Sequence, residues 1–171
     1  MTVQELSERF KADARKAGLC DEWFNGWGNP DKDSLIQKYK DGIDFQISTH
    51  FTTDRFILEN FTKDELRAMK VFVDDTYGES RSESGIYIVQ GDSECSFRFE
   101  DFAFATLHVF GNAKVEIITE DASKVFVNLY EYADAKVVQK DISKAYVYTH
   151  GDHCTASSVG DVLFRKSTSL A

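Results

Sequence analysis

The chain is poor in cysteine and proline. Its 171 residues include three cysteines and a single proline. Cys20, Cys95 and Cys154 are widely spaced and odd in number, which argues against a disulfide framework and against a zinc site built from CxxC pairs. We expect all three side chains to be thiols.

Long apolar runs are also missing. The longest run spans only a few residues, so no membrane-spanning segment is expected. The first residues, MTVQELSERFKADARK, carry charges from Glu5 onward and lack the apolar stretch of a secretory signal. The sequence therefore predicts a cytoplasmic protein.

Basic residues are in the minority. There are 20 Lys and Arg against 29 Asp and Glu, which gives a formal net charge of −9. The imbalance is spread over both halves, and neither shows the basic stripe that offsets phosphate repulsion in nucleic-acid-binding proteins. We expect no direct nucleic-acid ligand.

Apolar residues make up 42% of the chain, enough for the core of one domain with or without a small appendage. In the first ninety residues, apolar side chains at helical spacing predict a helix from about Val3 to Gly18 and further short helices after residues 33, 53 and 62. Residues 20–30 are predicted as a loop, and the alternation in IDFQIS predicts a strand over 43–48. We predict a mixed α+β N-terminal capping unit over residues 1–90.

An internal repeat dominates residues 91–171. Its unit is small–x–apolar–x–apolar, and it occurs six times, beginning at Cys95, Ala105, Ala113, Ser123, Ala135 and Ser143. Turn residues such as Gly111-Asn112 and Lys140-Asp141 separate several of the units. Repeats of this kind indicate a solenoid.

The spacing describes a flattened coil in which each turn of about twenty residues supplies two short strands. Strands one turn apart would then pair in parallel. We therefore predict an α+β chain in which residues 91–171 form a short parallel β-solenoid, or β-helix. The prediction places Lys114 beside Lys136 and Lys124 beside Lys144. An antiparallel meander is the alternative, because it has similar strand spacing.

The run GNAKVEIITEDASKVFVNLYEYADAKV resembles the decapeptide-type β-solenoid repeats of many uncharacterised proteins from bacterial and phage genomes. The segments GLCDEWFNGW and YKDGIDF are similar to the leading part of hypothetical proteins from gut bacteria and their mobile elements. These resemblances imply a fold and a phage or mobile-element setting, and they carry no catalytic residue across.

Aromatic side chains provide the candidate interaction residues. The turn spacing places Phe126 and Tyr146 above one another on the outer surface, with Tyr148 nearby and Tyr130 and Tyr132 at the following corner. Contiguous exposed apolar surface of this kind usually marks a contact site.

Trp23 and Trp27 lie in the glycine-containing segment 20–30. They are possible anchors for a partner or for a stacked ligand. Alternatively, they cover an end of the solenoid, where unpaired strand edges need protection.

Candidate metal ligands and acids are few. One segment holds four potential zinc ligands, at His150, Asp152, His153 and Cys154, but their spacing fits no established zinc pattern. A second group, Asp74 and Asp75 with Glu79 and Glu83, is more simply an acidic loop. We predict no catalytic residue, no metal and no cofactor.

These observations predict a non-enzymatic interaction module that acts on a protein partner or on itself as a homo-oligomer. A specific version is a phage or mobile-element protein that inhibits a host factor through an acidic and aromatic surface. The first alternative is a structural protein of a virion, fibre or filament that self-associates through the solenoid. The second is a carbohydrate-active or small-ligand-binding β-helix, with Glu116, Glu120 and Glu131 as its acids.

Overall fold

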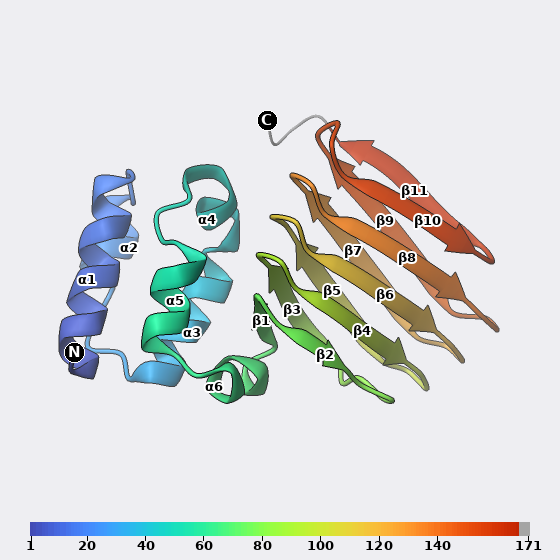
Figure 1. Cartoon of the computed structure of the whole chain (residues 1–171), viewed down its shortest axis with the longest axis horizontal. Coiled ribbons are helices and arrows are strands. Elements are labelled where there is room, and N and C mark those ends of the chain that lie inside the picture. The colour runs from blue at the N-terminus through green and yellow to red at the C-terminus, as the bar shows by residue number, and fades with distance from the viewer. Residues whose placement is uncertain (168–171) are drawn as a thin grey trace. The chain divides into compact units, whose positions relative to one another are not determined.

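A computed structural model describes residues 1–167 (Figure 1). The chain divides into two compact units, Met1–Met69 and a second unit that begins at Lys70. The sequence places the division later, near residue 90. It falls earlier because β1 (Val71–Val73) pairs in parallel with β3 (Gly85–Gln90), so that both strands belong to the solenoid.

The first unit is helical. Its helices are α1 (Val3–Lys16), α2 (Asp21–Asn25), α3 (Lys32–Asp41), α4 (Ile43–Thr49), α5 (Asp54–Asn60) and α6 (Lys63–Ala68). α1 begins with a capping box, in which Thr2 and Glu5 each accept a hydrogen bond from the other's backbone N–H. Thr62 and Glu65 form the same box at the start of α6. These reciprocal bonds fix where the two helices begin.

Phe10 of α1 lies at the centre of the helical core. Its ring centroid lies 5.5 Å from that of Phe56, 6.0 Å from Phe51 and 6.1 Å from Phe61. The buried residues around it recur at helical spacing and include Leu6, Ala14, Leu35, Ile36, Tyr39, Ile57 and Leu66.

Two predicted elements of this unit are wrong. Residues 43–48, predicted as a strand, lie in α4, and the predicted loop over 20–30 contains α2. The buried residues of α4 are Ile43 and Gln46, which lie three positions apart as on a helix face. The Gln46 amide donates to the carbonyl of Thr52 at 3.0 Å. The apolar alternation misled because a bonded glutamine occupies a buried position.

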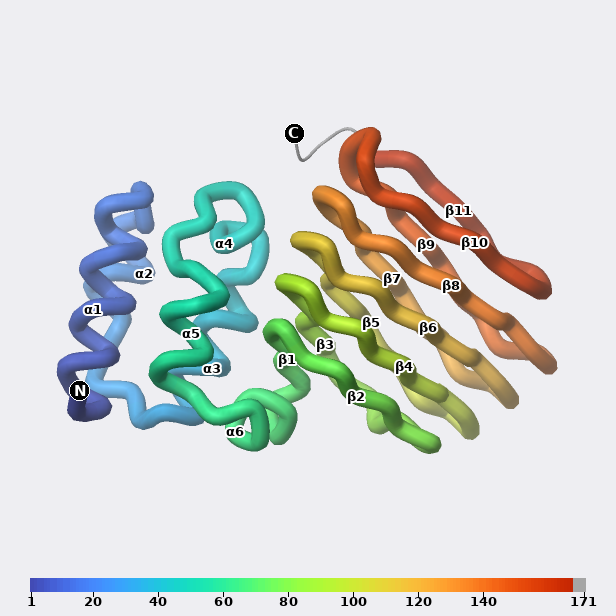
Figure 2. Tube along the Cα trace, in the orientation of Figure 1, coloured from blue at the N-terminus to red at the C-terminus, as the bar shows by residue number. Residues whose placement is uncertain are grey.

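The second unit is a parallel β-solenoid, as predicted (Figure 2). Alternate strands form two sheets. The six-stranded sheet has the order β1-β3-β5-β7-β9-β11, and the five-stranded sheet has the order β10-β8-β6-β4-β2. Every pairing is parallel, so the meander is excluded. The remaining strands are β2 (Thr76–Gly78), β4 (Glu94–Phe99), β5 (Phe104–Val109), β6 (Lys114–Thr119), β7 (Lys124–Tyr130), β8 (Asp134–Gln139), β9 (Lys144–His150), β10 (Thr155–Val159) and β11 (Val162–Ser167).

The central turns pair residues that are 20 positions apart, such as Leu107 with Val127 and Val127 with Val147. Because side chains alternate across a strand, every second residue points inward and stacks on its equivalents in the neighbouring turns. The inward columns Leu107–Val127–Val147 and Phe97–Ile117–Val137 are at most 2% exposed. They form one apolar core that both sheets share.

The corners are made by residues with a left-handed backbone, and these recur every ten positions, at Gly91, Asp101, Gly111, Asp121, Glu131, Asp141 and Gly151. Glycine adopts this conformation freely, and aspartate does so more readily than most residues. A Cβ atom at Gly111 would lie 3.0 Å from the backbone nitrogen of Gly91, so close stacking also favours glycine there.

The predicted contact between Lys114 and Lys136 is wrong. Lys114 pairs with Asp134, and Lys136 pairs with Glu116. Ala113 lies at the corner before β6, whereas Ala135 lies at the first inward position of β8 and pairs with Val115. Because both positions hold a small residue, the prediction matched Ala113 to Ala135 and shifted β8 by two residues. Lys124 does lie beside Lys144, as predicted.

Candidate interaction surface

The outer surface of the six-stranded sheet carries a group of apolar side chains, most of them in contact or on paired strands, which we call the aromatic face. Three of its members are 47–55% exposed and three are half-buried; the six are Ile86, Phe104, Leu163, Phe126, Tyr146 and Tyr148. The register brings them together, because it pairs Phe126 with Tyr146 and Tyr146 with Leu163. The juxtaposition of Phe126 and Tyr146 agrees with the predicted one.

The rings of the aromatic face are stacked. The centroids of Phe126 and Tyr146 are 4.8 Å apart with an interplanar angle of 12°. The ring centroid of Tyr148 lies 6.4 Å from that of Phe126, with an interplanar angle of 20°. The ring of Phe104 lies 5.7 Å from that of Phe126 and is tilted by 59°. Because each ring is held by its neighbours on paired strands, the patch is preorganised for contact.

The charges on this sheet have one sign. None of its six strands, all of which lie within the described residues, contains aspartate or glutamate, whereas lysine and arginine occur at Lys124, Lys144, Arg165 and Lys166, of which Lys166 is ion-paired with Asp152 outside the sheet. The Lys124 ammonium lies 5.3 Å from the ring centroid of Phe126 and 5.7 Å from that of Tyr146, within the range of cation–π attraction. The aromatic face is therefore cationic although the whole chain is acidic.

Tyr130 and Tyr132, the other two predicted interaction residues, differ in exposure. Tyr130 is only 4% exposed, and its ring stacks on His150 at 4.4 Å. Tyr132 is 61% exposed at the corner and stacks on His153 at 4.9 Å. Burial leaves Tyr130 with little surface to offer a partner, while Tyr132 extends the accessible aromatic surface to the corner.

Trp23 and Trp27 both belong to the helical unit. Trp27 is 6% exposed, and its indole N–H donates to the Ser7 hydroxyl at 2.9 Å. Trp23 is 39% exposed. Both line a cavity whose other walls are also residues of the first unit. Trp27 is therefore a buried wall of this cavity, and Trp23 is a partly exposed one.

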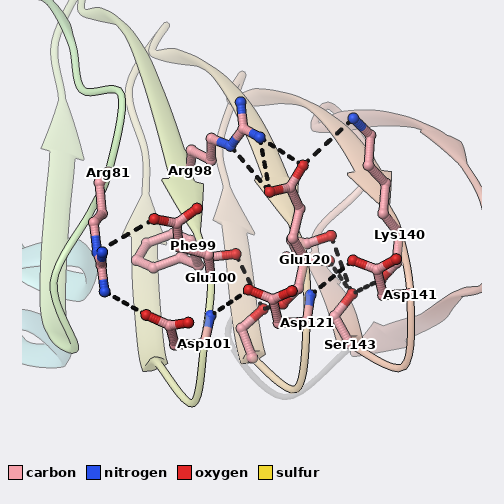
Figure 3. Close-up of polar contacts among 12 residues, drawn as sticks. Arg81, Arg98, Phe99, Glu100, Asp101, Glu120, Asp121, Lys140, Asp141 and Ser143 are labelled. Atoms are coloured by element: carbon pink, nitrogen blue, oxygen red, sulfur yellow. Dashed lines mark hydrogen bonds and ion pairs between the residues drawn. The ribbon is translucent and has the colours of Figure 1, made fainter.

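The three acids of the predicted carbohydrate-active alternative lie apart. Glu116 lies on the outer face of the five-stranded sheet beside Lys136, and Glu131 lies at one corner. Glu120 lies at the opposite corner, where Arg98 donates to its carboxylate at 2.8 Å and the Lys140 ammonium lies 3.5 Å away (Figure 3). The hydrogen bonds from Arg98 hold the pKa of Glu120 below its ordinary value of 4.5. An ionised, doubly paired carboxylate is a poor general acid.

The same corner carries a ladder of aspartates (Figure 3). The Asp121 carboxylate accepts from the backbone N–H of Asp101 at 2.8 Å, and the Asp141 carboxylate accepts from that of Asp121 at 3.0 Å. Arg81 forms ion pairs with Glu100 and Asp101 at the first of these turns. Each carboxylate thus ties one turn to the previous one, which is a structural task.

The four candidate zinc ligands of the segment 150–154 take separate partners. Asp152 pairs with Lys166 at 2.8 Å, His150 and His153 stack on tyrosines, and the Cys154 thiol points to the carbonyl of Gly151 at 3.8 Å. The hydrogen bond from Lys166 lowers the pKa of Asp152. Within residues 1–167, no three His, Cys, Asp or Glu side chains are grouped so that they could hold a metal.

The acidic loop after β1 serves the fold. The Asp74 carboxylate accepts from the backbone N–H of Asp92 at 2.7 Å, and Asp75 is 2% exposed. The backbone N–H of Asp75 donates to the Ser93 hydroxyl at 3.0 Å. These contacts attach the first turn to the second.

No family model, curated protein or solved structure matches the chain. None of the helices in residues 1–167 has the length and apolar character that crossing a bilayer requires. The three cysteines form no disulfide.

Ile86, Phe104 and Leu163 were not predicted from the sequence as members of the aromatic face, although Lys124 was correctly placed beside Lys144. A signal for the first two was present: the corner residues recur every ten positions, and counting from them gives the correct register. Leu163 follows a shorter step, since β11 pairs with β9 at an offset of 17 residues, Val162 with Ala145. The small residues of the repeat, on which the prediction relied, show neither the ten-residue spacing of the corners nor the shorter offset of β11.

Proposed function

We propose that the protein is a non-enzymatic interaction module that binds another protein through its aromatic face. The supporting observation is the set of ring contacts centred on Phe126, on a sheet whose strands carry cations and no carboxylate, in a chain with a net charge of −9. Large apolar patches with a polar surround usually mark contact sites.

The charges of the face favour one kind of partner over another. Two copies meeting through this surface would bring Lys124 and Lys144 close to cations of the same kind, which is unfavourable. A different protein, presenting apolar side chains among aspartates and glutamates, fits better. The proposed partner is thus acidic at the contact site, whereas the acidic surface expected from the net charge of the chain would favour a basic partner.

The resemblance to repeats from bacterial and phage genomes supports a more specific version. In this version the protein belongs to a phage or mobile element, acts in the bacterial cytoplasm and inhibits a host factor by occupying its surface.

The test compares two matched pairs of substitutions. Phe126→Ser with Tyr146→Ser disrupts the aromatic face, and Ile118→Ser with Val138→Ser removes two neighbouring half-buried apolar residues from the other sheet. We expect affinity capture from bacterial extract to retain a specific protein with the natural chain and with the control pair. The aromatic-face pair should lose it, and retention should weaken with salt. Identical capture by all three chains would contradict the proposal.

Light scattering over a dilution series addresses the assembly alternative. We expect the mass of a 19.4 kDa monomer at every concentration and salt. A stable trimer or larger assembly that Phe126→Ser with Tyr146→Ser dissolves would instead assign the same face to self-association.

A further inference from the structure

A cavity of about 350 Å³ lies within the helical unit. Aromatic side chains form much of its wall, namely Phe10, Trp23, Trp27, Tyr39, Phe45 and Phe51. This volume falls in the range of small-molecule sites, which is about 300–1,000 Å³. The apolar wall selects a ligand with an apolar body.

The wall is held in place by its own contacts. The indole N–H of Trp27 donates to the Ser7 hydroxyl at 2.9 Å, and both side chains are buried. The Lys38 ammonium lies 5.2 Å from the Trp27 ring centroid. A site fixed in this way requires little ordering when a ligand enters.

The polar residues of the wall are mainly acidic. Asp41 and Asp44 are exposed members of the lining, and Lys38 is the one basic residue that the described part of the chain contributes to it. The Lys38 charge already lies against Trp27, and Asp41 accepts from the Gln37 amide at 2.8 Å. Two carboxylates and several aromatic ring faces together favour a positively charged group.

We propose that this cavity binds a small organic cation, an amine with an aromatic or apolar body. The body lies among Phe10, Trp27 and Phe45, and the ammonium group faces Asp41 and Asp44. The site lies in the other unit from the aromatic face, so each proposal can fail without the other.

The two tryptophans of the chain both line this cavity, so tryptophan fluorescence reports on it selectively. Two probes with one apolar body and opposite charges are 3-phenylpropylamine and 3-phenylpropionate. With the full chain, we expect saturable binding of the amine with a Kd at least tenfold lower than that of the carboxylate. No binding of the amine, or equal binding of both probes, would overturn the proposal.

Variants separate the charge from the cavity. Asp41→Asn with Asp44→Asn should remove the preference for the amine while leaving binding of neutral propylbenzene unchanged, and Asp33→Asn, on α3 outside the lining, is the control. Ala14→Leu should fill the cavity and abolish binding of all three probes. Should Ala14→Leu fail to fold, the exposed Asp variants still decide. A preference for the amine that survives the loss of both carboxylates would refute the assignment.

Discussion

The two sheets of the solenoid share one interior but have different outer surfaces. The five-stranded sheet alternates charges between neighbouring strands: Lys114 pairs with Glu94 on one side and Asp134 on the other, and Glu116 pairs with Lys136. The six-stranded sheet replaces this pattern with stacked rings and two adjacent lysines. Opposite charges on paired strands stabilise a sheet, whereas adjacent like charges do not.

This difference indicates which surface needs an explanation beyond folding. The charges of the five-stranded sheet are accounted for by their own neighbours. Lys124 and Lys144 lie side by side on strands that contain no acidic residue, and the neighbours of Lys124 are aromatic rings that remain partly exposed. In a solenoid, packing determines which residues can point inward, whereas the outward residues are free to evolve for binding.

The largest expected effect comes from the interior that both faces share. Leu107 is fully buried between the sheets. Leu107→Ala should lower the free energy of unfolding by about 2–5 kcal/mol, because it leaves a cavity in a closed core. Urea unfolding followed by far-ultraviolet circular dichroism measures this. Thr106→Ala, at the neighbouring outward position, should change stability by less than about 0.5 kcal/mol. Equal effects would contradict the inward and outward assignment.

A corner that joins the two faces gives the next effect. Asp121 has a φ of 54°, and its carboxylate accepts from the backbone N–H of Asp101. Asp121→Ala loses the bond and places a side chain without local hydrogen bonding in a left-handed conformation, at a combined cost of about 2–3 kcal/mol. Asp121→Gly loses only the bond and should cost about 1 kcal/mol. Thermal unfolding of both variants tests the order. A glycine variant less stable than the alanine variant would show that backbone conformation is not limiting there.

The solenoid could be predicted from the sequence because its inward residues repeat, while the helical unit was harder. Val125, Val127 and their equivalents alternate with outward residues in every turn, so several independent segments support the same strand prediction. The strand predicted over 43–48 rested on a single short segment, in which Gln46 hid the helical spacing. The aromatic face could be predicted only in part, since its membership depends on register, and Tyr130 shows that an aromatic residue at an expected outward position can still be buried. The cavity could not be predicted, because it depends on how four helices and their loops pack.

Lowering the pH should weaken the corner at which Arg98 pairs with Glu120. The pKa of Glu120 is lowered by its hydrogen bonds from Arg98, so its contribution to stability is present above the ordinary glutamate pKa of 4.5 and is lost as the pH falls through the lowered value. Glu120→Gln should therefore flatten part of the decline in solenoid stability below pH 4.5. Arg98→Gln should flatten the same part, because it removes the cause of the shift. Urea midpoints measured across this range decide, and an unchanged profile in both variants would refute the role of the pair.

The smallest effect on stability is expected from the charges of the aromatic face, where stability and binding should respond differently. Lys124→Glu with Lys144→Glu loses the cation–π contacts of Lys124 with Phe126 and Tyr146, worth about 0.5–1 kcal/mol at an exposed site, and keeps two like charges adjacent, so the fold should be little affected. Lys114→Glu with Lys136→Glu changes the net charge equally but turns opposite-charge neighbours into like-charge neighbours, at about 0.2–1 kcal/mol for each pair.

Partner binding should be lost in the variant that keeps its stability and kept in the variant that loses stability. The Lys124 and Lys144 variant keeps its stability and loses the captured protein, because its carboxylates face those of the partner. The Lys114 and Lys136 variant loses stability and keeps the captured protein. Urea unfolding and capture from the same preparations give both readings. If capture fell equally in the two variants, net charge rather than the aromatic face would control association, and the difference between the two sheets would have no bearing on function.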